Sequence, residues 1–334
     1  MPFSTSSFER YLASRPWILI LGMATAIFAC FVTDMELQLV HLRYKPTISS
    51  DRDYWVDLRI RADKLGSKAL VIIGASRIQL GLDLDVLRRK TGLEPVQLAI
   101  DGSSPNLILE GLAKDPKFKG IVIVDYYTPA IGTNGGAGNY FQKAFETEDA
   151  KPFSWLTGHD IEKYLTKLLH ENLRVYSDGA NPWLSFTYRI LVLQPQSQYL
   201  ITMADRSRKA DYTKVQMPDF YYSQVARTLG IQVNAKEKNI EFLLRQKVNE
   251  QAALINSNDW HKKVEGTRKL VEAIQTKGGK VVFVGMPSSG MVREIEELRY
   301  PKAQYWDYFV QNVGAPAIHS NYTPILRGFG CPIG

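Results

Sequence analysis

A serine follows the first strongly apolar segment after residue 40, at a place where a hydroxyl group could act on a ligand. Residues 69–73 (ALVII) are typical of a strand buried on both faces, and Gly74-Ala75-Ser76-Arg77 come directly after them. Ligands of parallel α/β sheets bind at the carboxyl ends of the strands. We therefore expect the Ser76 hydroxyl to face solvent, near backbone N–H groups that can stabilise an oxyanion.

A glycine takes the matching place after the next strand. Residues 96–100 predict a second short strand, which ends at Asp101 and Gly102. Without a side chain, Gly102 lets its N–H group approach a ligand closely. Ser76 and Gly102 also have a simpler interpretation. Small residues between a strand and a helix often form only a tight turn, in which a serine caps the helix.

Two further polar side chains are candidates for substrate contacts. Arg77 could pair with a carboxylate or phosphate of a substrate, or it could be an ordinary charge at a helix end. Asn134 lies in the glycine-rich segment 132–139 (GTNGGAGN). This segment lacks the glycine spacing and the Lys-Ser/Thr of a P-loop, so we interpret it as a surface loop.

The elements that must position these residues alternate between strands and helices. Further strands are predicted from residue 120 to about Asp125, at 280–285 and at 317–319. Helices are predicted from near Asp83, up to Leu112, over 238–277 with a break near 257–259, and at 293–298 and 304–313. This order predicts an α/β fold with a doubly wound parallel sheet and right-handed crossovers.

Residues 150–235 have no clear period and are rich in aromatic residues and proline. We interpret them as an insertion over one end of the sheet. They could serve only for packing, or they could form a lid or cap that binds substrate.

The N-terminal region contains an apolar segment. Residues 17–32 (WILILGMATAIFACFV) carry no charge, and the amphipathic stretch to residue 40 can extend the helix. We predict a cytoplasmic N-terminus (1–16), a transmembrane anchor (17–40) and a juxtamembrane connector with a helix (41–68). Arginines before the segment and acidic residues after it place the main domain outside the cytoplasm.

Two other interpretations of the apolar segment stay open. A cleaved signal peptide would use the weak small-residue sites at Ala24, Ala26 and Ala29, and a lipoprotein signal would use Cys30. The segment could also be a buried helix of a soluble protein.

The composition excludes some classes of function. The 334 residues carry a net charge of +7, but the basic residues are spread along the chain without an RNA- or DNA-binding signature. We therefore expect no nucleic-acid partner. No Cys/His or His/carboxylate cluster has metal-ligand spacing, so neither a metal nor another cofactor is predicted. Cys30 and Cys331 are not expected to form a disulfide.

From residue 69 onward the chain resembles the SGNH/GDSL hydrolase superfamily. Gly74-Ala75-Ser76-Arg77 is similar to the first block of that family, and residues 99–105 (AIDGSSP) are similar to the second. The resemblance implies an SGNH-type sheet, with Ser76 as nucleophile. It also implies that Gly102 and the Ser76 backbone donate N–H groups to an oxyanion.

The chain departs from the family in two places. The third strand is followed by Asp125 and two tyrosines, where the family has an asparagine, and an ionised aspartate repels an oxyanion. The family's Asp-x-x-His pair is absent from residues 278–334. A serine is a weak nucleophile without an adjacent base. His319, the one histidine in that region, is expected to belong to a strand.

The resemblance and the anchor together give two expectations for function. The first is an esterase or O-acyltransferase of the bacterial inner membrane, with a periplasmic domain, that acts on acyl esters such as those of an envelope polysaccharide. The second is a non-catalytic SGNH scaffold with a binding or assembly role in the envelope. A soluble nucleotide-binding domain fits less well, because the glycine spacing is wrong.

Overall fold

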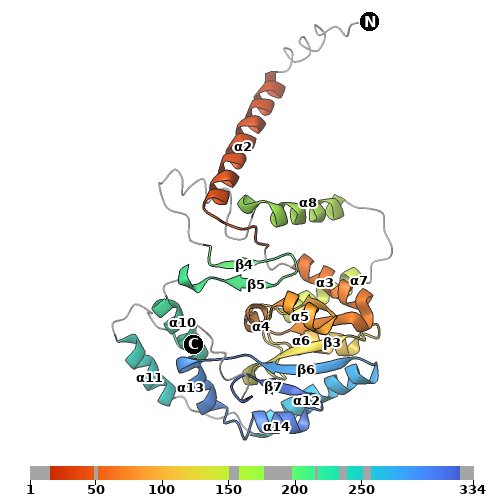
Figure 1. Cartoon of the computed structure of the whole chain (residues 1–334), viewed down its shortest axis with the longest axis vertical. Helices are drawn as coiled ribbons and strands as arrows, with labels where there is room; N and C mark the ends of the chain where they lie inside the picture. Colours follow the sequence, from red (N-terminus) through yellow and green to blue (C-terminus); the bar gives the residue numbers. More distant parts are fainter. Residues whose placement is uncertain are drawn as a thin grey trace. The chain divides into compact units, whose positions relative to one another are not determined.

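The computed structural model divides the chain into two compact units, which we describe separately (Figure 1). The structure describes residues 16–48, 52–149, 158–176, 198–214, 217–232, 239–250 and 257–323. The first unit consists of Met1–Ser49 and Gly158–Ile201, and the second of Ser50–Thr157 and Thr202–Gly334. The predicted insertion at 150–235 is therefore divided between the two units, with 150–157, 177–197, 215–216 and 233–235 outside the described residues.

The second unit is built on a five-stranded sheet. Its strands are β1 (Ala69–Ile73), β2 (Glu94–Gln97), β3 (Ile121–Tyr126), β6 (Lys280–Gly285) and β7 (Ala317–His319). They lie in the order β2-β1-β3-β6-β7, and every neighbouring pair is parallel. The predicted mixed α/β fold with a parallel sheet is confirmed.

The second strand begins earlier than predicted. Pro95 is compatible with β2 because this strand lies at the edge of the sheet, where a missing N–H is tolerated. Leu98 and Ile100 still donate backbone hydrogen bonds to Ile72 and Gly74, so the predicted segment runs along β1 without counting as regular strand.

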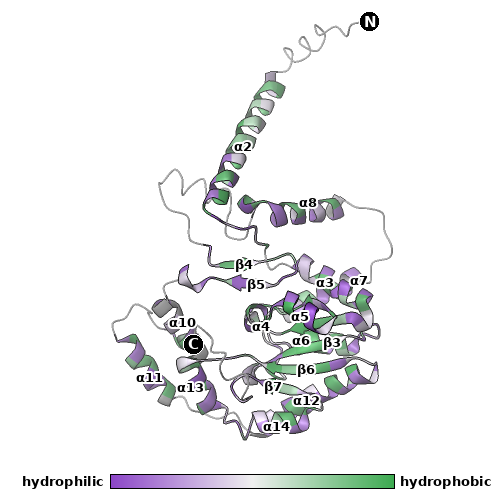
Figure 2. Ribbon diagram, in the orientation of Figure 1, coloured by the Kyte–Doolittle hydropathy of each residue, from purple (hydrophilic) through white to green (hydrophobic). Residues whose placement is uncertain are grey.

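Alternate residues of the strands enter two separate cores, as the two-residue period of a strand requires. Val71, Val122 and Phe283 lie in the larger core, whereas Ile72 lies in the smaller one. Both faces of the sheet are thus covered, and Figure 2 shows the central strands as mainly hydrophobic. This explains the continuous apolar runs that identified the strands.

Most of the predicted helices are present with shifted ends. The helices of the second unit are α3 (Arg52–Leu65), α4 (Ser76–Gly81), α5 (Leu84–Thr91), α6 (Asn106–Lys114), α7 (Gly138–Asp149), α10 (Met217–Leu229), α11 (Ile240–Glu250), α12 (Ser257–Thr276), α13 (Gly290–Arg299) and α14 (Trp306–Asn312). A separate two-stranded sheet joins β4 (Leu200–Thr202) and β5 (Arg208–Ala210). Asp83 caps α5 as predicted, since its carboxylate accepts the N–H groups of Asp85 and Val86 at 2.9 and 3.0 Å.

Two predictions about helices need correction. The short helix α4, which begins at Ser76 itself, was not predicted. Its six residues are too few to show a helical period in the sequence. The predicted break near 257–259 is wrong in place, since α12 begins at Ser257. Residues 251–256, between α11 and α12, lie outside the described residues.

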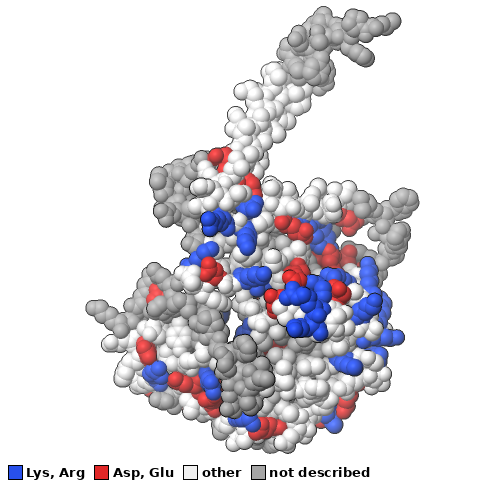
Figure 3. Space-filling model, viewed as in Figure 1, with Lys and Arg blue, Asp and Glu red and all other residues white. Residues whose placement is uncertain are grey.

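The first unit contains α2 (Pro16–His41), α8 (Gly158–Asn172) and the 3₁₀ turn η3 (Arg174–Tyr176). The 26 residues of α2 extend over about 39 Å, more than a hydrocarbon core of about 30 Å. Most of its large apolar side chains are exposed, and Figure 3 shows almost no charge along it. The prediction of one helix able to span a membrane is confirmed by its length and composition.

Candidate functional site

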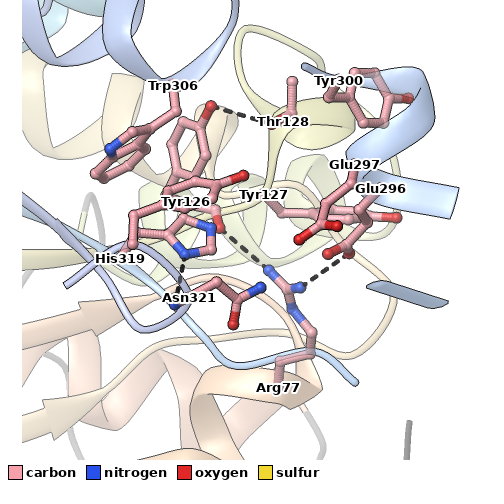
Figure 4. A pocket seen from close by; sticks show the side chains of 11 residues that line it. Arg77, Tyr126, Tyr127, Thr128, Glu296, Glu297, Tyr300, Trp306, His319 and Asn321 are labelled. Carbon is pink, nitrogen blue, oxygen red and sulfur yellow. Dashed lines mark hydrogen bonds and ion pairs between the residues drawn. The ribbon is translucent and has the colours of Figure 1, made fainter. Parts of the chain in front are cut away.

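A small pocket opens at the carboxyl edge of the sheet, and its lining residues follow or end strands β1, β3, β6 and β7. It encloses about 30 Å³, room for roughly one or two water molecules. Figure 4 shows its lining side chains, which come from α4, the ends of β3 and β7, α13 and α14. These residues are Arg77, Tyr126, Tyr127, Thr128, Glu296, Glu297, Tyr300, Trp306, His319, Asn321 and Tyr322.

Arg77 is the centre of an ion-pair cluster in this pocket. Its guanidinium donates to Asp125 Oδ1 and to the carbonyl oxygen of Tyr126, both at 3.2 Å, and lies 3.7 Å from Glu296 Oε1. It also stacks 4.4 Å from the centre of the Tyr127 ring. Its side chain is 30% exposed, so this arginine is held on three sides and still reaches the pocket.

Beside Arg77, Asp125 is buried and Glu296 is partly buried, and the loss of solvent raises the pKa of both carboxyls. The charge of Arg77 opposes this effect at each of them. Asp125 also accepts the backbone N–H of Ala75 at the start of α4. A side chain on Gly74 would overlap Asp125 there, so the glycine of the first motif allows β1 and β3 to approach.

A hydrogen-bonded chain connects Glu296 to the last strand. Ser288 donates its hydroxyl to Glu296 Oε2 at 2.7 Å, and Asn321 Nδ2 donates to the Ser288 oxygen at 3.2 Å. This chain fixes one oxygen of Glu296, while the other lies near Arg77. The polar groups of the pocket are therefore already oriented without a ligand.

His319 ends β7 and packs into the pocket wall. Its ring contacts the rings of Tyr126, Trp306 and Tyr322, and it covers Gly285, where a side chain would overlap it. Burial lowers the pKa of His319 to about 4, and the positive charge of Arg77 acts in the same direction. The ring is therefore neutral at pH 7.

The hydrogen bond of the His319 ring decides where its proton lies. Nδ1 accepts the backbone N–H of Asn321 at 3.2 Å, so the neutral ring carries its proton on Nε2. A histidine base in a serine triad has the opposite arrangement, with Nδ1–H donated to a carboxylate and Nε2 free to accept. Of the described residues, no carboxylate forms an ion pair with this ring.

The structure places the four predicted site residues in different surroundings. Ser76 is the first residue of α4 and is half-buried, and among the described side chains and backbone groups its hydroxyl has no hydrogen-bond partner. Gly102 is exposed, with a φ of +60°. Asn134 accepts a hydrogen bond of 2.6 Å from Asn106. Only Arg77 of the four lines the pocket.

The remaining pocket residues were not predicted as a site. Tyr126 ends β3, Tyr127 follows it, and His319 ends β7. These three residues could have been predicted, because ligands of parallel sheets bind at the carboxyl ends of the strands. Glu296 lies in the middle of α13, where nothing in the sequence distinguishes it from its neighbour Glu297. Within the described residues, no three His, Cys, Asp or Glu side chains gather as a metal site. The prediction that no metal is bound stays a prediction.

The fold and this pocket define a mixed α/β protein with one helix that could cross a membrane. Comparison with family models, curated proteins and solved structures finds no match. The resemblance to SGNH hydrolases therefore stays a prediction based on Ser76, Gly102 and the motifs around them.

Proposed function

We propose that this chain is an inner-membrane protein with a periplasmic, SGNH-like domain that binds a ligand of the cell envelope and does not hydrolyse it. Two features support the scaffold. The strands follow the chain order 2-1-3-4-5, which is known from doubly wound sheets. Ser76 and Gly102 follow the first and second strands, as the corresponding family residues do.

The observation that carries the non-catalytic role is the state of His319. Acyl transfer by Ser76 needs a base that accepts its proton. His319 is the histidine at the end of the last strand, but its Nδ1 accepts an N–H and its pKa is held at about 4. A ring with its proton on Nε2 cannot use Nε2 as a base, and so low a pKa makes it a poor base at pH 7.

The charges beside Ser76 also favour binding over acyl transfer. The Asp125 carboxylate accepts the N–H of Ala75, one residue before Ser76. A negative charge there would repel an oxyanion formed at Ser76. Arg77, which could have balanced an oxyanion, is already paired with Asp125 and Glu296.

The pocket suggests what kind of ligand the domain would bind. A volume of about 30 Å³ is too small for a sugar ring, so a polymer would lie across the mouth and insert only a small substituent. Tyrosine and tryptophan rings with hydroxyl and carboxylate groups suit a polar, partly apolar ligand such as an O-acetylated glycan.

The first test measures ester hydrolysis and oligosaccharide binding by the full chain in detergent micelles. We expect hydrolysis of p-nitrophenyl acetate no faster than with Ser76→Ala. We also expect an O-acetylated oligosaccharide to bind, its deacetylated form to bind less well, and Arg77→Ala to weaken the binding. Ester turnover that is lost in Ser76→Ala would refute the proposal.

One observation favours a second candidate, serine-dependent O-acyl chemistry. The Ser76 hydroxyl is half-buried at the carboxyl edge, and among the described residues it is not tied to a hydrogen-bond partner. In that case a base other than His319 would take the Ser76 proton as the serine oxygen attacks the acyl carbon, and its conjugate acid would give that proton to the leaving alcohol. Water or a second alcohol would then take the acyl group from Ser76 and free the serine. Turnover that persists in His319→Gln and is lost in Ser76→Ala would support this candidate.

A further inference from the structure

The helix α8 exposes its apolar face. Ile161, Tyr164, Leu165 and Leu168 recur at intervals of three and four residues, so they share one side of the helix. These four side chains are between 46% and 67% exposed. Figure 2 shows hydrophobic and hydrophilic residues alternating around α8, as expected for an amphipathic helix.

The other side of α8 is polar and less exposed. Asp160, Lys163, Lys167 and His170 lie on that side, and all four are only partly accessible. A helix packed on a water-soluble protein has the reverse arrangement, with its apolar side inward. On α8 the apolar side chains are therefore the more exposed ones, and these four polar side chains are the less exposed ones.

The turn after α8 is held on the membrane-spanning helix. Arg174 donates to Glu36 Oε1 through its guanidinium at 2.8 Å, and its backbone N–H donates to Glu36 Oε2, also at 2.8 Å. Val175, fully buried, packs against Met35 and Leu39 of α2. The C-terminal end of α8, two residues before Arg174, is therefore fixed to a defined level of α2.

Glu36 lies close to the point where α2 would leave the hydrocarbon core of a membrane. The apolar run of α2 ends at Val32, and Glu36 follows four residues later, about 6 Å along the helix. Val32 itself packs against the cluster that holds η3. Figure 1 shows α8 running across the direction of α2 rather than along it.

We propose that α8 is an interfacial helix, which lies in the plane of the membrane that α2 crosses and inserts its apolar face among the lipids. The proposal rests on α2 being a membrane anchor. Interfacial helices bury an apolar face 5–10 Å into the boundary between headgroups and acyl chains. The position of η3 brings α8 to this boundary, and Tyr164 belongs to a residue type that concentrates there.

The charge of α8 indicates which lipids it needs in order to bind a bilayer. Lys163 and Lys167 are outnumbered by Asp160, Glu162 and Glu171. An excess of acidic residues gives no attraction to anionic lipids, so the apolar area must provide the binding. We therefore expect α8 to bind zwitterionic bilayers, and anionic lipid should not strengthen the contact.

The test places an environment-sensitive fluorophore on single cysteines in the full chain, reconstituted in phosphatidylcholine vesicles. The background is Cys30→Ser with Cys331→Ser. Leu165→Cys reports the apolar face of α8, and Thr166→Cys, which is also exposed but lies outside the apolar face, is the matched control. We expect the Leu165 label to emit at shorter wavelength and to be quenched several-fold more by lipid-bound nitroxide than by aqueous iodide. The Thr166 label should show the reverse.

Two results would overturn the proposal. Equal iodide quenching at both positions would mean that α8 lies in water. Protection of the Leu165 label from both quenchers, together with disulfide formation between chains of the unlabelled Leu165→Cys variant, would mean that a second copy covers the apolar face. A label at Met23→Cys in α2 separates this failure from failure of the anchor, because only a lost anchor would remove lipid quenching at both Met23 and Leu165.

Discussion

Two arginines in the second unit are each paired with two carboxylates, but they lie at opposite edges of the sheet. At the amino edge, Arg59 of α3 pairs with Asp63 and Asp115, and its side chain is fully buried. Lys277, just before β6, donates to three backbone carbonyls around Asp115, between 2.6 and 3.0 Å. This cluster holds α3, α6 and α12 together, and none of its residues lines the pocket at the carboxyl edge.

At the carboxyl edge the same residue types form an open cluster. Arg77 pairs with Asp125 and Glu296, but almost a third of its side chain stays exposed and lines a pocket. The same residue types therefore form a structural ion-pair cluster at the amino edge of the sheet and a candidate binding site at its carboxyl edge. Helices and loops after the strands leave an accessible crevice at the carboxyl edge.

The largest effect is expected for Arg59→Ala. This substitution leaves two carboxylates buried beside each other without a cation, which costs about 3–5 kcal/mol of unfolding free energy. Chemical denaturation of the full chain in detergent would measure it. Arg61→Ala, which removes an exposed ion pair with Glu94, is the matched control and should cost below about 1 kcal/mol. Equal losses in both variants would contradict the role assigned to Arg59.

The next largest effect is the pH dependence that His319 gives to the free energy of unfolding. Its pKa falls from an ordinary value near 6.5 to about 4 in the folded protein. Only the unfolded chain takes up the proton between these values. Stability that is present above pH 6.5 is therefore lost as the pH falls to about 4, by an amount on the order of 3 kcal/mol. His319→Gln should lack this loss, which unfolding curves at several pH values would reveal.

An NMR titration of the His319 ring checks the same prediction directly. The ring should stay neutral, with its proton on Nε2, down to about pH 4. A midpoint near 6.5, or a proton on Nδ1, would contradict the contacts described for this ring.

A smaller loss is expected for Arg77→Ala, about 1–3 kcal/mol, because this arginine is partly exposed. Its removal should raise the pKa of Asp125 and Glu296 further. A carboxyl whose folded pKa is raised loses stability as the pH rises through that pKa. The deficit of Arg77→Ala relative to the original chain should therefore grow from acidic to neutral pH. Denaturation at both ends of that range tests the sign, and a deficit that shrinks toward neutral pH would refute it.

The smallest effect on stability is expected for Ser76→Ala. Among the described residues the serine hydroxyl has no partner, so its loss should change the unfolding free energy by less than about 0.5 kcal/mol. The same denaturation assay measures it. A loss above about 1 kcal/mol would indicate that the hydroxyl makes a structural bond.

The strands were predictable because both faces of the sheet are covered, which makes each strand a continuous apolar run. Ser76 was correctly placed after β1 for the same reason. The pocket was not predictable, since Arg77, Asp125 and Glu296 come from three distant segments that only the folded sheet brings together. The period of α8 was hidden within residues 150–235, whose sequence as a whole shows none.

We predict that Ser76 is not an activated nucleophile, and a serine-reactive probe can measure this on the intact protein. The full chain would be incubated with a fluorophosphonate, which forms a covalent bond with activated serines, and its intact mass measured beside that of Ser76→Ala. We predict no mass increase for either chain at neutral pH. Stoichiometric labelling of the original chain that is absent from Ser76→Ala would contradict the account.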